Sequence, residues 1–175
     1  MKKVAANTVL SHPLAGLPVV GKVAHEADMR VTPRSRIRYK VVIFETQHCL
    51  LQFWGHFFRY QLPDNALAAV RDVSTTVWGP ANGGTEYLRV DPKYFAVVGL
   101  VDRHITTNVL AHEAAHLAYA YDRRMGKRNP FIDPHNHEEQ LAYPVGIITQ
   151  QLTDLLVKLH DTGVVHSCRE GENLH

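Results

Sequence analysis

The sequence predicts an α+β fold in a single domain, residues 1–175, with a small mixed or antiparallel sheet followed by two long helices. Two segments, 37–44 and 94–101, are rich in β-branched, aromatic or other apolar residues, as strands require. Two later segments, 106–124 and 136–161, have start and stop signals typical of helices. No internal repeat or linker-like stretch divides the 175 residues, a length that suits one domain with its own core.

The first half of the chain is expected to contribute one strand and two helices. Residues 1–35 are predicted to be an irregular N-terminal segment, and Ile37–Phe44 (IRYKVVIF) a strand buried on at least one face. Thr46–Tyr60 should form an amphipathic helix, because its large apolar residues recur at intervals of three and four. These residues are Leu50, Phe53, Trp54, Phe57 and Phe58. A short helix over Asp64–Val73, with Pro63 and Asp64 at its start, is expected next.

Two further strands are expected in the middle of the chain. Thr85–Val90 (TEYLRV) alternates polar and apolar residues, which is typical of a half-buried strand, and Asp91 and Pro92 end it. Tyr94–Val101 (YFAVVGLV) is almost continuously apolar, which favours a more buried strand. This hairpin-like pair leads directly into the next helix.

The helix that follows is expected over Thr106–Arg124. Thr106 or Thr107 would be its N-cap, and Gly126 would end it. The basic residues at and after its last turn complement the negative end of the helix dipole. They are Arg123, Arg124, Lys127 and Arg128.

The last helix is expected to start near Asn136, which has capping-box spacing to Glu139, and to end at about Asp161. Pro144 should kink this helix within its first turns. The predicted apolar stripe consists of Leu141, Val145, Ile148, Leu152, Leu155, Leu156 and Leu159.

Composition excludes several classes of protein. A formal net charge of +2 gives no argument for a nucleic-acid or membrane partner, and no apolar run approaches the roughly 20 residues that span a bilayer. Cys49 and Cys168 are far apart, so neither a disulfide framework nor a thiolate zinc site is indicated. We therefore expect a soluble protein in a reducing compartment, and we interpret the opening residues as mature N-terminus rather than a signal peptide.

Residues 112–116 read H-E-A-A-H, and this motif indicates a chemical function. On a helix, His112 and His116 lie one above the other on one face, so both imidazoles can bind a single metal ion. Glu113 is rotated by about 100 degrees and can reach a metal-bound water. The spacing predicts a zinc site in which Glu113 acts as general base.

This motif, on a helix that follows a strand and with an E-x-x-A pattern (Glu139 to Ala142) on a later helix, resembles the zincin metallopeptidases, specifically the gluzincins. The resemblance covers Thr85–Asp161, the predicted metal-site core of a zincin-like domain. Small phage-encoded and other minimal gluzincins are the most similar group. The resemblance implies peptide hydrolysis by a zinc-activated water, in a host cytoplasm or a virion if the protein is phage-encoded.

A catalytic zinc keeps three protein ligands, so a third ligand is needed. Glu139 is favoured, because small residues follow on its side of the helix and allow close approach to the alanine-rich face of the motif helix. Four other candidates remain open. Glu138 lies on an apolar stripe, Asp122 has the metzincin-type spacing without the usual glycine, and His135 and His137 could complete an all-histidine site like that of Spartan-type proteases.

Roles are also expected for residues around the metal. Tyr143, one turn beyond Glu139, is a candidate oxyanion donor. It stands where many gluzincins carry an acidic residue that orients the ligating histidines. The strand before the motif helix pairs with extended substrate in that group, which here suggests Thr85–Val90.

The sequence therefore predicts a zinc metalloendopeptidase acting on a peptide or protein substrate. The alternative is a catalytically weak or inactive zinc-stabilised protein that serves as an interaction or assembly module. A weaker third hypothesis is a DNA-associated protease, which no DNA-binding motif supports. The sequence leaves substrate sequence, biological process and oligomeric state open.

Overall fold

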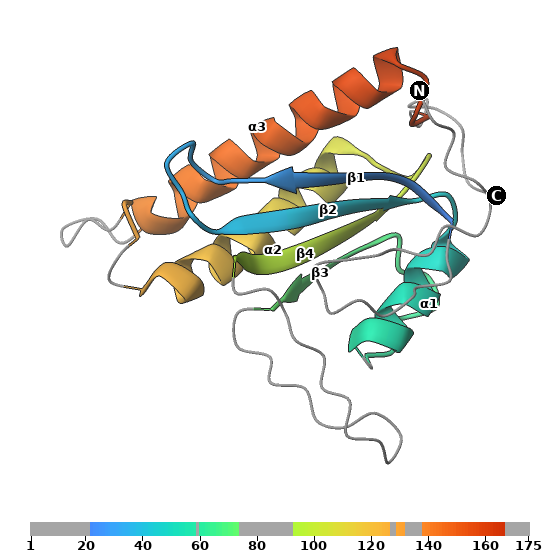
Figure 1. The fold of residues 1–175 in the computed structure, drawn as a ribbon, viewed down its shortest axis with the longest axis horizontal. Helices are drawn as coiled ribbons and strands as arrows, with labels where there is room; N and C mark the ends of the chain where they lie inside the picture. Colours follow the sequence, from blue (N-terminus) through green and yellow to red (C-terminus); the bar gives the residue numbers. More distant parts are fainter. Residues whose placement is uncertain (1–21, 59, 74–92, 127–128, 132–137, 167–175) are drawn as a thin grey trace.

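The computed structural model describes residues 22–58, 60–73, 93–126, 129–131 and 138–166 (Figure 1). The mixture of strands and helices confirms the predicted α+β class. The elements in chain order are β1 (Val23–Met29), β2 (Arg38–Phe44), α1 (Gln47–Phe58), β3 (Ala68–Asp72), β4 (Tyr94–Val101), α2 (Thr107–Met125) and α3 (Glu139–Asp161).

The described strands form one mixed sheet in the order β1-β2-β4-β3. β1 is antiparallel to β2, β2 is parallel to β4, and β3 is antiparallel to β4. Val98 in β4 lies between Val41 of β2 and Val70 of β3, so β4 has a hydrogen-bonded neighbour on each side. Helix α1 covers one face of this sheet, and α2 and α3 cover the other (Figure 1).

The α1 face of the sheet is packed with aromatic residues, as the spacing in Thr46–Tyr60 predicted. Phe53, Trp54 and Phe58 are almost fully buried against Val42 and Val97 of the sheet. Their rings contact one another, with centroids 5.0–5.8 Å apart. Burying large rings in this way supplies much of the apolar area that holds α1 on the sheet.

The opposite face carries the two long helices. Leu117 and Ala118 of α2 and Ile148 and Leu152 of α3 are fully buried in the core formed with this face of the sheet. The Tyr39 hydroxyl of β2 donates to Gln151 Oε1 of α3 at 2.9 Å, which satisfies a polar atom at the edge of this core. The predicted strand 94–101 and the predicted helices 106–124 and 136–161 are confirmed in type.

The end of α3 is tied to the end of β4 by the buried Asp102. Its Oδ1 accepts the backbone N–H of His166 at 2.8 Å, and its Oδ2 lies 2.9 Å from His166 Nδ1. Oδ1 also accepts the backbone N–H of Arg103, whose φ of 66° turns the chain from β4 toward α2. A buried carboxylate with several donors is well satisfied, so this junction is fixed in place.

The predicted short helix over Asp64–Val73 is wrong, because Ala68–Asp72 forms strand β3. Its alanines favour a helix, and Pro63 and Asp64 resemble a helix start. The backbone of β4, however, needs hydrogen-bond partners on both edges, and this segment supplies one of them. Tertiary pairing therefore outweighs local propensity here.

The prediction that residues 1–35 are irregular is wrong at Val23–Met29, which forms strand β1. The segment pairs with β2 through its backbone, and residues of opposite charge also meet across the two strands. The Nζ of Lys40 in β2 lies 2.8 Å from Asp28 Oδ1 and 3.4 Å from Glu26 Oε2. Such cross-strand pairing of opposite charges leaves no hydrophobic pattern in the sequence.

The start of α3 differs slightly from the prediction. The helix begins at Glu139, and Asn136, its predicted cap, lies outside the described residues. Helical structure continues through Pro144, which lies in the second turn. The predicted strand Thr85–Val90 also lies outside the described residues.

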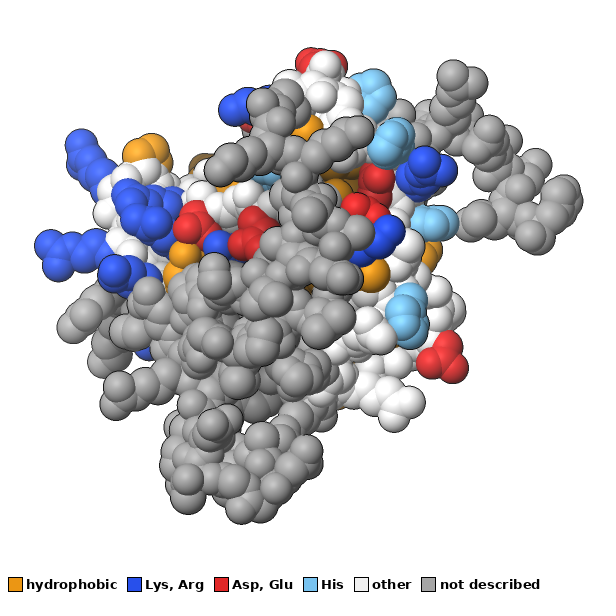
Figure 2. All heavy atoms as spheres, turned by 45° about the vertical axis from the view of Figure 1, so that its right-hand side comes forward, with side chains coloured by type: hydrophobic (Ala, Val, Ile, Leu, Met, Phe, Trp, Pro, Cys, Tyr) orange, Lys and Arg blue, Asp and Glu red, His pale blue; other side chains and the backbone are white. Residues whose placement is uncertain are grey.

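Basic side chains and histidines lie in different parts of the surface. In the face that Figure 2 shows, a group of Lys and Arg side chains lies to the left and His side chains lie to the right. Among the described residues, no helix is long and apolar enough to cross a membrane.

The packing of α1 on β4 depends on Gly99. A Cβ at this position would lie 2.6 Å from Leu50 Cδ1 and 2.6 Å from Trp54 Cζ3. We expect Gly99→Ala to lower the free energy of unfolding by about 1–3 kcal/mol through overpacking. Gly55 is solvent-exposed in the middle of α1, and a Cβ added there would meet no atom within 4 Å. Gly55→Ala should therefore raise the free energy of unfolding by about 0.5–1 kcal/mol. Urea denaturation measures both, and a neutral Gly99→Ala would contradict this packing.

Candidate metal centre

Helix α2 presents the H-E-A-A-H motif and has the predicted ends. Thr106 is the N-cap, and its Oγ1 accepts the backbone N–H of Val109 at 3.3 Å. Gly126 ends the helix with a φ of 50°, a conformation that a residue with a Cβ adopts less readily. The motif therefore lies in the second and third turns of a helix capped at both ends.

The two histidines of the motif converge on one point. His112 and His116 are exposed on α2, and their Nε2 atoms are 3.1 Å apart. The ring centroids are 4.7 Å apart with an interplanar angle of 75°. The two Nε2 atoms face each other at hydrogen-bonding distance, so one imidazole donates to the other, and the same closeness lets the pair bind one cation.

Glu113 differs from the two histidines in being buried. Only 6% of its surface is exposed, and no hydrogen bond or ion pair joins its carboxylate to another described residue. Burial raises the pKa of Glu113 to about 6, although a charge on His112 opposes this shift. A carboxylate with this pKa is well suited to exchanging protons near neutral pH.

His116 is predominantly neutral at neutral pH. Partial burial lowers the pKa of its imidazole, and the neighbouring His112 lowers it further. The neutral imidazole is the form that binds a metal.

A cavity of about 440 Å³ lies between α2 and β3 and includes His116 in its wall. Its other lining residues are Val70, Arg71 and Asp72 of β3 and Tyr119, Ala120 and Arg123 of α2. Arg123 Nε lies 3.3 Å from Asp72 Oδ2, which joins helix and strand across this cavity. The candidate metal site therefore opens into a polar cavity.

The structure brings together two of the three predicted zinc ligands. Among the residues that it describes, no group of three His, Cys, Asp or Glu side chains could hold a metal ion. Glu139 is half-buried at the start of α3, and Glu138 before it is exposed. His135 and His137 lie outside the described residues.

Asp122 is engaged in hydrogen bonds away from the histidine pair. Its Oδ1 accepts from the side chains of Asn129, at 2.7 Å, and Gln140. Asp122 is rotated by about 120 degrees from His116 around the helix axis. The contact with Gln140 therefore places the start of α3 beside the last turn of α2, on another side of α2 from the histidines.

Two tyrosines have different surroundings from those that the motif suggested. Tyr143 is exposed, and its ring stacks on Phe131 with centroids 6.1 Å apart. Tyr119, for which the sequence pattern predicted no role, lines the cavity together with His116. Its spacing of three residues from His116 could have indicated this position, because residues three apart share a helix face.

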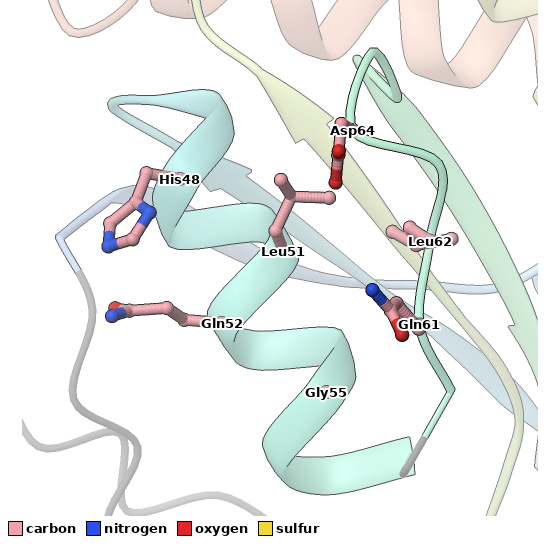
Figure 3. A pocket seen from close by; sticks show the side chains of 7 residues that line it. All are labelled: His48, Leu51, Gln52, Gly55, Gln61, Leu62 and Asp64. Atoms are coloured by element: carbon pink, nitrogen blue, oxygen red, sulfur yellow. The ribbon is translucent and has the colours of Figure 1, made fainter.

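A second hollow, of about 470 Å³, lies on the outer side of α1 (Figure 3). Leu51 points toward Leu62 and Asp64, whereas His48 and Gln52 point away from them (Figure 3). The polar groups of this hollow do not converge, in contrast to His112 and His116.

No protein-family model, curated protein or solved structure matches this chain. The functional assignment therefore rests on the residues of α2 and β3 and on their geometry.

Proposed function

We propose that the protein is a zinc-dependent metallopeptidase whose metal is held by His112 and His116. The observation that carries this proposal is the convergence of the two Nε2 atoms, 3.1 Å apart, beside a buried carboxylate. Histidines four residues apart on a helix face provide two ligands to one ion without any change of backbone.

The distance between the two nitrogens fits zinc. With Zn–N bonds of about 2.0–2.1 Å and tetrahedral angles, two ligating nitrogens lie about 3.3 Å apart. A small rotation of either ring accommodates the difference from the 3.1 Å found here. The lowered pKa of His116 also favours zinc binding, because a neutral imidazole needs no deprotonation before it binds a metal.

Glu113 is suited to move the proton during hydrolysis. Zinc, when bound, supplies an acidified water and polarises the scissile carbonyl. Glu113 would take the proton from the attacking water and return it to the leaving amine. It lies on the flank of α2 that leads to Ala120, about two turns further on, and Ala120 lines the cavity beside β3.

Substrate is proposed to run along β3. The resemblance to gluzincins suggested the strand Thr85–Val90 for this role. β3 is the described strand that shares a cavity with His116, and it stands at the end of the described strand order. An extended peptide in this cavity would present its backbone to the metal site.

Glu139 stays our prediction for the third ligand, and Tyr143 for the oxyanion donor. Since α3 begins beside Asp122, ligation by Glu139 would require the first turn of α3 to move toward the histidines. Glu138, Asp122, His135 and His137 stay alternatives for the ligand.

One observation favours a second candidate function. The described residues place only two metal ligands together, and a site with fewer ligands binds zinc weakly. A zinc-stabilised interaction module without peptidase activity would fit such a site. The role of Glu113 separates the two functions, because only a peptidase needs a general base.

We expect the purified protein to contain about one zinc per chain and to lose it in His112→Ala and His116→Ala. Glu113→Gln should retain zinc and lower peptidase activity by about a hundredfold or more, because the general base is removed. Metal content by mass spectrometry and cleavage of a mixed peptide library measure these effects. His48→Ala, an exposed histidine on α1, is the matched control and should change neither. Wild-type protein without zinc would contradict the proposal, and zinc without cleavage would favour the interaction module.

The third ligand is tested by a matched pair of carboxamide variants. We expect Glu139→Gln to weaken zinc binding by more than the roughly 10- to 100-fold typical of a supporting residue, because a direct ligand is lost. Glu138→Gln, one residue earlier, should leave the affinity unchanged. Competition with a chelating dye measures both affinities. Unchanged binding in Glu139→Gln together with loss in His135→Ala or His137→Ala would assign the ligand to residues 132–137.

A further inference from the structure

Arg123 lies along α2 from His116 in the same cavity. The two residues are seven apart, which is about 10.5 Å along the axis and only about 20 degrees around it. Both line the cavity between α2 and β3. An extended chain advances about 3.3 Å per residue, so Arg123 is about three residues from a peptide bond at the metal site.

Asp72 holds Arg123 without covering it. Asp72 Oδ2 lies 3.3 Å from Arg123 Nε, and the Asp72 side chain is 17% exposed, whereas that of Arg123 is 62% exposed. A guanidinium has five N–H donors in a fixed plane, and Nε carries only one of them. The two terminal nitrogens can therefore bind a second carboxylate while Nε stays in its ion pair with Asp72.

The guanidinium of Arg123 favours an acidic ligand. It is 62% exposed and borders the cavity, whereas the guanidinium of Arg71 lies over the Tyr60 ring, 5.8 Å from its centroid. An acidic side chain in the cavity would be attracted to Arg123, and a basic one would be repelled by it.

We propose that Arg123 is a specificity-determining residue that selects peptide segments with an acidic side chain about three residues from the scissile bond. This inference rests on the proposed peptidase function, since the distance is counted from the histidine pair. Asp72 is its positioning residue. The basic run at the end of α2 then has a role beyond the helix dipole, which was the interpretation from sequence.

The first test measures binding, in the zinc-loaded Glu113→Gln protein. The probe is an array of short peptides that differ only by Glu, Gln or Lys at one position, with that position scanned through each peptide. We expect about tenfold stronger binding of peptides with Glu at one position. The added change Arg123→Gln should abolish this preference, and Arg123→Glu should reverse it toward Lys.

Arg124→Gln is the matched control, because Arg124 is exposed on the same turn and does not line the cavity. It should keep the preference for Glu. Circular dichroism and zinc content confirm that each variant is folded and loaded. A preference for Glu that survives in Arg123→Gln, or that disappears equally in Arg124→Gln, would overturn the proposal.

Cleavage by the active protein separates this proposal from the peptidase assignment. Cleavage sites mapped by mass spectrometry should show Asp or Glu about three residues from the cut, and Arg123→Gln should remove this enrichment. Cleavage without any acidic enrichment would overturn the role of Arg123 and leave the peptidase. Binding with a preference for Glu but without cleavage would overturn the peptidase and keep Arg123 as a recognition residue.

Discussion

Strand β4 is the element on which the rest of the structure depends. All eight of its residues are buried, and it pairs with β2 on one edge and β3 on the other. A backbone buried on both faces must satisfy its hydrogen bonds within the sheet. Because the apolar side chains of β4 point to both faces of the sheet, each face also needs a covering layer of helix. The end of β4 leads through Asp102 and Arg103 into α2, so its position also fixes where the histidine pair begins.

The candidate site places exposed histidines and a buried carboxylate on a single helix. His112 and His116 are exposed at the surface of α2, where a cation and a substrate can reach them. Glu113, between them in sequence, is buried, and its raised pKa follows from the loss of solvent around a charged group. Burial of this kind costs stability, because the carboxylate loses its hydration. A rigid helix, capped by Thr106 and ended by Gly126, holds these groups in register.

The cavity beside the histidines is made by two elements that are distant in sequence. β3 is placed against α2 because it completes the hydrogen bonding of β4, and Arg123 and Asp72 then meet across the gap. The same pairing that overrides helix propensity in Ala68–Asp72 thus creates the wall opposite His116. Fold and candidate site share this cause. Tyr119 and Arg123 complete the wall because they follow His116 at intervals of three and seven.

The sequence by itself determined the elements with strong local patterns: the strands at 37–44 and 94–101, the aromatic helix after the first of them, and α2 with both of its caps. It also determined the histidine pair, because a spacing of four on a helix is a local geometry. Only the tertiary structure decided that Val23–Met29 is a strand, since this segment pairs with β2 and its acidic residues contact Lys40 of that strand. It likewise decided that Ala68–Asp72 is a strand that lines a cavity with His116, and that α3 begins beside Asp122. These features depend on contacts between residues far apart in the chain, which leave no periodic trace in the sequence around them.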